Sequence, residues 1–88
     1  MPPVEPMNDI ADQVPWSDHL TDYDRSHFDI YLRLLDATTE GADEDEIIRI
    51  VLNIDPAAQP ERARQTFESH LKRARWMTET GYRDLLHS

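Results

Sequence analysis

Two prolines near the middle of the chain separate two stretches in which apolar residues follow helical spacing. Pro56 comes directly after Asp55, and a residue before proline avoids the helical conformation, so the first stretch has to end there. Pro60 suits the first turn of a new helix, where the missing N–H of proline costs little. Residues 41–65 therefore predict a helix, a turn and a second helix, and with them an all-α domain.

A further helix is predicted upstream, over residues 22–37. Thr21 suits its N-cap, because a threonine oxygen can accept from a free backbone N–H, and Asp24 stands three residues later as in a capping box. Gly41 can adopt the left-handed conformation that ends many helices. The apolar residues between them are Phe28, Ile30, Tyr31, Leu32, Leu34 and Leu35. A stripe this broad indicates packing neighbours on two sides.

The second helix is predicted over residues 43–53, with Asp43 as N-cap and Glu46 completing a capping box. Its β-branched residues would also suit a strand, but the acidic cap and the spacing of the apolar residues favour a helix. We expect the core side to carry Ile47, Ile50, Val51 and Ile54, with Ile48 and Leu52 at one flank.

The third helix is predicted over residues 60–80, with Gly81 as its stop. Arg73 falls outside its apolar stripe, and Trp76 lies nearly opposite that stripe. The stripe itself consists of Ala63, Phe67, His70, Leu71, Ala74 and Met77. A short C-terminal helix is expected to follow and to turn Tyr82, Leu85 and Leu86 toward the core.

The N-terminal residues show no helical period and contain four of the six prolines within residues 1–15. We expect residues 1–14 to form a disordered tail and residues 15–88 to form one interaction domain. Trp16 is expected to cover the edge of the core, at the point where the chain joins the domain. The predicted fold is thus a three-helix variant of the helix-turn-helix with a short C-terminal helix.

Composition argues against several classes of protein. The chain has no cysteine, which excludes disulfides and thiolate metal sites. No apolar run reaches the length of a membrane span and no leader is evident, so a cytoplasmic protein without membrane contact is expected.

Nothing in the sequence predicts an enzyme, a cofactor or a metal site. The four histidines lack the spacing of a zinc site, and His70 is expected to be an interior imidazole rather than a ligand. The acidic run from Asp43 to Glu46 lacks the glycine and the final glutamate of a calcium loop. With two glycines in the whole chain, a glycine-rich phosphate loop is absent.

The charge of the chain bears directly on what a helix-turn-helix could bind. The formal net charge is −9, although residues 61–88 hold six bases against four acids. Affinity for DNA comes largely from Lys and Arg that neutralise phosphates, so an acidic body opposes it. We therefore expect no binding of duplex DNA at physiological salt, and a DNA-binding regulator of the helix-turn-helix class remains the alternative.

Three stretches of the sequence resemble a known family. They are "LTDYDRSHFDIYLRLLDA", "IVLNIDP" and "PERARQTFESHLKRARWMTETGYRDLL", which together span most of residues 15–86. The chain is similar to domain-of-unknown-function family 2285, small helix-turn-helix variants of integrative and conjugative elements, and most of all to their stand-alone antiactivators. The resemblance implies a monomeric antiactivator that binds a transcriptional activator, such as a LuxR-type quorum-sensing regulator, and so represses conjugative transfer.

The surface expected to bind such an activator joins the second helix to the start of the third. Glu44 and Asp45 point outward from the first turn of the second helix, and we expect Arg62 and Gln65 to emerge beside them. Trp76 is the candidate aromatic anchor. The predicted partner-binding residues are Glu44, Asp45, Arg49, Glu61, Arg62, Gln65 and Trp76. The alternative surface is the back of the third helix, around Lys72, Arg75 and Trp76.

Overall fold

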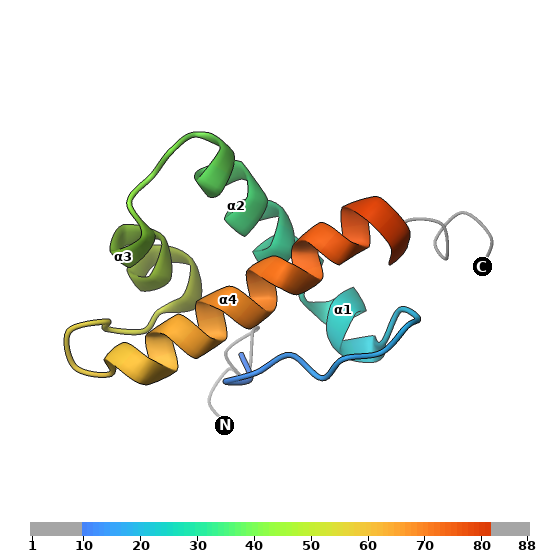
Figure 1. Cartoon of the computed structure of the whole chain (residues 1–88), viewed down its shortest axis with the longest axis horizontal. Helices are drawn as coiled ribbons and strands as arrows, with labels where there is room; N and C mark the ends of the chain where they lie inside the picture. Colours follow the sequence, from blue (N-terminus) through green and yellow to red (C-terminus); the bar gives the residue numbers. More distant parts are fainter. Residues whose placement is uncertain (1–9, 82–88) are drawn as a thin grey trace, which may run out of the picture.

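The computed structural model describes residues 10–81 of the chain. Its elements are α1 (Asp22–Ser26), α2 (Phe28–Thr39), α3 (Glu44–Ile47), η1 (Ile48–Leu52), α4 (Pro60–Trp76) and η2 (Met77–Gly81). The two η segments are π-helical turns that continue α3 and α4 (Figure 1). The predicted all-α class and its three main helices are confirmed, while the predicted helix around Tyr82, Leu85 and Leu86 lies outside the described residues.

The first predicted helix is divided in two at His27, which leaves the helical conformation with φ −122° and ψ 20°. Its capping box is confirmed: the backbone N–H of Asp24 donates to Thr21 Oγ1, and the backbone N–H of Thr21 donates to Asp24 Oδ2. Gly41 adopts the expected left-handed conformation, with φ +79°. The predicted capping box of the second helix is wrong, since Asp43 stands at the N-cap without a side-chain hydrogen bond.

The core side predicted for the second helix is confirmed for Ile47, Val51 and Ile54 but is wrong for Ile50. Ile47, Ile48 and Leu52 are buried, whereas Ile50 is 62% exposed. The cause is the π-helical turn of η1, because a wider turn rotates each residue around the axis by less than an α-helical turn does. The helix ends at Asn53, whose left-handed φ of 57° redirects the chain into the turn of residues 53–59.

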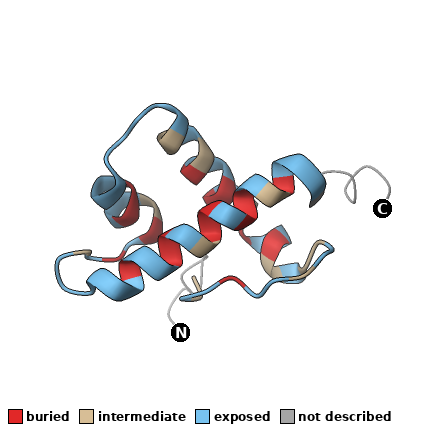
Figure 2. Ribbon diagram, in the orientation of Figure 1, coloured by how far each residue is buried: buried red, intermediate tan, exposed pale blue. Residues whose placement is uncertain are grey.

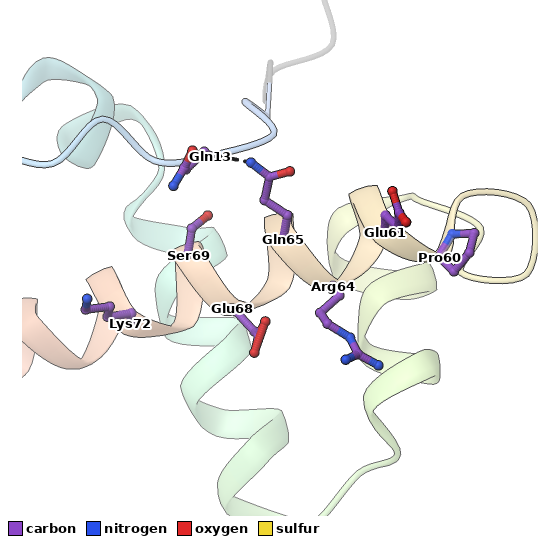
Figure 3. A pocket seen from close by; sticks show the side chains of 8 residues that line it. All are labelled: Gln13, Pro60, Glu61, Arg64, Gln65, Glu68, Ser69 and Lys72. Atoms are coloured by element: carbon purple, nitrogen blue, oxygen red, sulfur yellow. Dashed lines mark hydrogen bonds between the residues drawn. The ribbon is translucent and has the colours of Figure 1, made fainter.

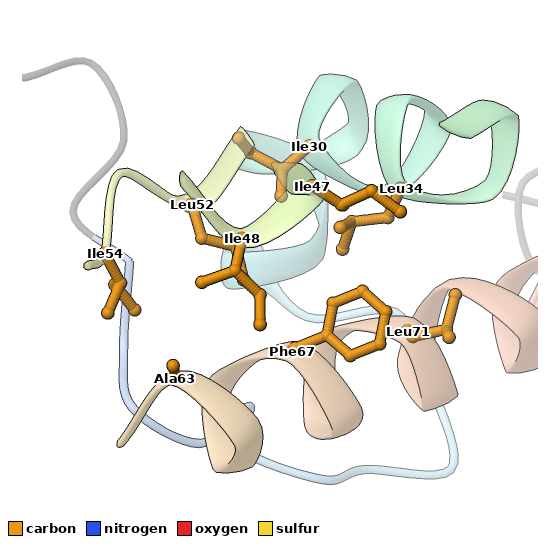
Figure 4. Packing of buried hydrophobic residues seen from close by; sticks show 9 residues of the cluster. All are labelled: Ile30, Leu34, Ile47, Ile48, Leu52, Ile54, Ala63, Phe67 and Leu71. Carbon is orange, nitrogen blue, oxygen red and sulfur yellow. The ribbon is translucent and has the colours of Figure 1, made fainter. Parts of the chain in front are cut away.

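The core lies where α2 and the α3–η1 helix pack against one side of α4 (Figure 4). Its main cluster is Ile30, Leu34, Ile47, Ile48, Leu52, Ile54, Ala63, Phe67 and Leu71. Buried and exposed residues alternate along α4, so that one side of this long helix remains open (Figure 2). The apolar stripe predicted for α4 is confirmed, because each of its members from Ala63 to Met77 is buried.

Arg73 corrects the sequence prediction most strongly, because it is wholly buried although its position in the helix predicts a place outside the core stripe. Its Nε and Nη2 donate to the two carboxylate oxygens of Asp24 over 3.0 and 2.6 Å. Nη1 donates to the carbonyl of Ser17, and Nη2 also donates to that of His19. Both charges are compensated by hydrogen bonds and by each other, which burial requires.

The carboxylate of Asp24 is the acceptor at the centre of this arrangement. It also accepts from the hydroxyl of Tyr31 over 2.8 Å. Burial alone would raise the pKa of Asp24, but the hydrogen bonds from Arg73, Thr21 and Tyr31, together with the charge of Arg73, hold its pKa below the usual value. Burial and then the neighbouring Asp24 carboxylate raise the pKa of Tyr31. Asp24 therefore stays ionised inside the protein.

Residues 10–16 run beside α4 and are called the N-terminal strap below (Figure 1). Val14 is only 6% exposed, and Ile10 packs against the main core cluster. The sequence places residues 10–14 in the tail because they lack a periodic pattern. Their contacts are made with residues far away in the sequence, so a local pattern could not reveal them. Residues 1–9 lie outside the described range.

His70 occupies the core as a hydrogen-bonded imidazole, as predicted. Its Nδ1–H donates to the carbonyl of Thr66 over 2.7 Å, and its Nε2 accepts from the hydroxyl of Tyr23 over 2.5 Å. Burial, with a smaller contribution from His27, lowers the pKa of His70 against the effect of the Thr66 hydrogen bond. Tyr23 in turn accepts from the backbone N–H of Ala11, so the imidazole is linked to the strap.

The π-helical turn predicts which residue of η1 stabilises the fold. Replacing the buried Leu52 by alanine should lower the free energy of unfolding by about 2–5 kcal/mol. The matched change Ile50→Ala, two residues away on the exposed side, should cost less than about 0.5 kcal/mol. Urea unfolding followed by circular dichroism measures both. A larger loss for Ile50→Ala than for Leu52→Ala would restore the register predicted from the sequence.

The burial of His70 predicts that mild acid destabilises the domain. Because its pKa is lowered in the folded state, the unfolded chain binds a proton first as pH falls below about 6.5, and the free energy of unfolding then decreases. One such group accounts for at most about 1.4 kcal/mol per pH unit. Denaturation between pH 7.5 and 5 should show a flatter dependence for His70→Gln than for the wild type. An unchanged slope in His70→Gln would contradict the assignment.

Candidate nucleic-acid interface

The open side of α4 carries charges of both signs at helical spacing. This outer face consists of Glu61, Arg64, Gln65, Glu68, Lys72, Arg75 and Glu79, all exposed. Positions three or four residues apart share one side of a helix, so these side chains form a single stripe opposite the core. The acids and bases are equal in number, and the outer face is therefore neutral although the whole chain is acidic.

The bases of the outer face are available for binding. Arg64, Lys72 and Arg75 form no ion pair with any residue between 10 and 81, where the paired arginines are Arg25, Arg62 and Arg73. The ammonium of Lys72 lies 5.4 Å from the centroid of the Trp16 ring, a cation–π distance that leaves its N–H donors free.

Arg64 stands at the junction of the outer face with α3. It lines a cavity of about 250 Å³ with Glu44 and Asp45 of α3 and with Ile48, Pro56, Pro60 and Ala63. Arg64, rather than Arg62, is thus the base beside the acidic first turn of α3. Glu44 and Asp45 are exposed as predicted, and Arg49 is exposed on η1.

Arg62 and Gln65 do not join Glu44 and Asp45, contrary to the sequence prediction. Arg62 Nε donates to Asp12 Oδ1 over 2.7 Å, and its Nη1 donates to the side chain of Gln59. Gln65 Nε2 donates to Gln13 Oε1 over 3.3 Å, as the dashed line in Figure 3 shows. Both side chains therefore turn toward the N-terminal strap, whose place beside α4 no local sequence pattern predicts.

A hollow of about 580 Å³ follows the first half of α4 (Figure 3). Its lining residues are Gln13, Pro60, Glu61, Arg64, Gln65, Glu68, Ser69 and Lys72. Apart from Pro60, the lining residues have polar or charged side chains, and they include Glu61 from the predicted set.

Trp76 lies at the other end of α4, where it is partly covered instead of standing free. Its ring lies 3.8 Å from the Arg73 guanidinium carbon, and the ring of Trp16 meets it edge-on at 5.9 Å. Trp16 is 50% exposed and also lies over Arg73. Both indoles contact the guanidinium of the buried Arg73, so Trp76 serves the core as well as any surface. Trp16 covers the rim of the core as expected.

The described residues offer no metal site. Between residues 10 and 81, no three His, Asp or Glu side chains come together as a metal site would need. No helix in that range is both long and apolar enough to cross a membrane.

The predicted partner-binding residues lie on α3, η1 and α4, and Arg64 is not among them. The signal was present, because Arg64, Glu68, Lys72 and Arg75 recur at three- and four-residue intervals on the side opposite the apolar stripe. The preference for Arg62 followed from its place at the start of the helix. Only the position of the strap shows that Arg62 is engaged elsewhere.

Comparison with known protein families relates the chain to a regulator of transcription. A family model described as "T6SS, Transcription factor, DNA binding domain" (RovC_DNA-bd) matches residues 8–87. No curated protein matches the chain. The match agrees with the helix-turn-helix outline, but it names neither family 2285 nor an antiactivator.

The matched region takes in every element from α1 to η2 and the strap that precedes them. Its description concerns the DNA-binding part of a transcription factor, which is not a family of enzymes. The helix, turn and helix formed by α3–η1, residues 53–59 and α4 are the arrangement expected of such a domain. The chain belongs to the RovC_DNA-bd family of transcription-factor DNA-binding domains.

Proposed function

We propose that this chain regulates transcription by placing the outer face of α4 against duplex DNA. The observation that carries the proposal is a row of three bases on that face, Arg64, Lys72 and Arg75, which form no ion pair with residues 10–81. The family of the chain is described as DNA-binding. In helix-turn-helix domains the second helix of the unit enters the major groove. α4 occupies that position here, and its open side faces away from the core.

The spacing of the basic side chains on the outer face matches the width of the DNA major groove. Arg64 and Lys72 are eight residues apart, which corresponds to about 12 Å along a helix axis. The major groove of B-DNA is also about 12 Å wide, so the two side chains can reach phosphates on both of its edges. Arg64 lies near the start of α4, where a recognition helix usually contacts the edges of DNA base pairs. Its guanidinium can donate hydrogen bonds to the acceptor atoms of guanine.

The acidic side chains of the outer face limit its affinity for DNA. Glu61 and Glu68 stand on either side of Arg64, and Glu79 follows Arg75. Carboxylates near phosphates are repulsive, and the net charge of −9 adds a long-range penalty. We therefore expect binding near the non-specific range of about 10⁻⁴–10⁻⁶ M, falling steeply with salt.

The acidity of the surface favours a second function, that of an antiactivator working through protein contact. The first turn of α3 exposes Glu44, Asp45 and Glu46, and the first two line a cavity with Arg64. This mixture of charges suits a basic protein surface better than a polyanion. The partner is then a transcriptional activator, and the family resemblance suggests a LuxR-type regulator of conjugative transfer.

Removing the bases of the outer face tests the first function. Fluorescence anisotropy with a labelled duplex of about 20 base pairs at 50 mM salt should show at least a tenfold loss of affinity for the Arg64→Gln, Lys72→Gln, Arg75→Gln variant. The salt dependence of log K should flatten by roughly 0.9 for each phosphate that the variant no longer neutralises. Arg33→Gln, which removes an exposed base from α2, is the matched control and should change affinity by less than about twofold.

Two results would contradict DNA binding through α4. In the first, the wild type does not bind the duplex at about 100 μM protein in low salt. In the second, the triple variant and Arg33→Gln lose the same amount of DNA affinity for each charge removed. The antiactivator function expects the first of these results. It also expects Glu44→Lys, Asp45→Lys to relieve repression in an activator-dependent reporter while the free energy of unfolding changes by less than about 1 kcal/mol.

A further inference from the structure

The N-terminal strap follows one flank of α4 and contacts it at regular intervals. Asp12 pairs with Arg62, Gln13 bonds Gln65, and the backbone N–H of Val14 donates to Ser69 Oγ over 3.3 Å. The last contact in this series is that of Trp16 with Trp76. The contacted positions of α4 are three, four and seven residues apart, so they lie along one line of the helix.

This line borders the outer face at the end of α4 that approaches bases in a helix-turn-helix complex. Arg62 and Gln65 are the two side chains there that combine long reach with donors suited to guanine and adenine. Both remain exposed, but both are hydrogen-bonded to the strap. The Asp12 carboxylate also places a negative charge where a DNA phosphate would otherwise approach Arg62.

We propose that the N-terminal strap is an autoinhibitory contact, in which Asp12 and Gln13 occupy Arg62 and Gln65 and thereby weaken the binding of DNA by α4. The proposal rests on the function proposed above. Displacement of Asp12 and Gln13 adds Arg62 to the bases of the outer face and removes one repulsive carboxylate. The strap therefore controls how many basic side chains of α4 can bind a polyanion such as DNA.

The middle of the strap is held less firmly than the residues on either side of it, which makes partial release feasible. The side chains of Asp12 and Arg62 are 58% and 44% exposed, and exposed ion pairs contribute at most about 1 kcal/mol. Val14, in contrast, is buried, and Ala11 donates to Tyr23. A polyanion can therefore compete for Arg62 while Val14 remains in the core.

The test compares Asp12→Asn with Asp18→Asn in the full chain. Both changes remove one carboxylate from the segment before α1, but Asp18 is exposed and makes no ion pair with residues 10–81. With the same labelled duplex at 50 mM salt, Asp12→Asn should raise DNA affinity by about two- to fivefold, the range of an exposed ion pair. Its salt dependence should steepen by about 0.9, as expected for one additional neutralised phosphate. Asp18→Asn should show less than half of that gain and no change in salt dependence.

A second comparison separates release of Arg62 from a general effect of charge. In an Arg62→Gln background, Asp12→Asn should no longer raise affinity beyond the gain of Asp18→Asn. Equal gains from Asp12→Asn and Asp18→Asn, or a gain that persists without Arg62, would overturn the autoinhibitory contact. If the wild type binds DNA through Arg64, Lys72 and Arg75 and only these comparisons fail, the proposed function stands without the strap. If no variant binds DNA at all, both fail together.

Discussion

The buried ion pair between Arg73 and Asp24 is the interaction on which the arrangement of the whole domain depends. Through it α4 holds the start of α1, the carbonyls of Ser17 and His19, and, by way of Tyr31, the helix α2. Loss of either partner would leave an uncompensated charge in the interior, at a cost of about 3–5 kcal/mol. A buried pair of this kind contributes less to stability than to the selection of one arrangement, since an apolar pair of similar volume can be as stable. Here Arg73 also holds the segment that follows the N-terminal strap, through the carbonyls of Ser17 and His19.

The fold could be predicted to the extent that it follows from local patterns. The cap at Thr21, the stop at Gly41 and the apolar stripe of α4 depend on residues a few positions apart, and the structure confirms each of these predictions. The exposure of Ile50 escapes prediction because a π-helical turn has no signature in spacing rules based on 3.6 residues per turn. The burial of Arg73 escapes it because the partner of this residue lies 49 residues away in the sequence. The same holds for the strap, whose contacts with α4 span 50 residues or more.

In the candidate interface, too, the features set by neighbouring residues could be predicted from the sequence, whereas those set by contacts between distant residues could not. The sequence locates the acids of α3 and the bases of α4, but their relative placement depends on the turn of residues 53–59 and on the strap. Arg64 lines a cavity with Glu44 and Asp45, and Arg62 is held by Asp12. α4 therefore has an outer face whose bases form no ion pair with residues 10–81, and a flank that the strap contacts. A helix-turn-helix scaffold with a neutral face on an acidic body can serve either DNA or a protein, and the salt dependence of binding distinguishes the two.

DNA binding by α4 and its inhibition by the strap both require that the outer face of α4 is the surface of this domain that contacts DNA. Titration of the ¹⁵N-labelled chain with an unlabelled 20-base-pair duplex, followed by amide chemical-shift mapping at 50 mM salt, examines that surface residue by residue. We expect the largest shifts from Arg64 to Arg75, with smaller shifts at Glu44 and Asp45 and none around Leu32 and Leu35 on α2. Shifts concentrated on α2, or no shifts at a severalfold excess of DNA, would contradict DNA binding through α4.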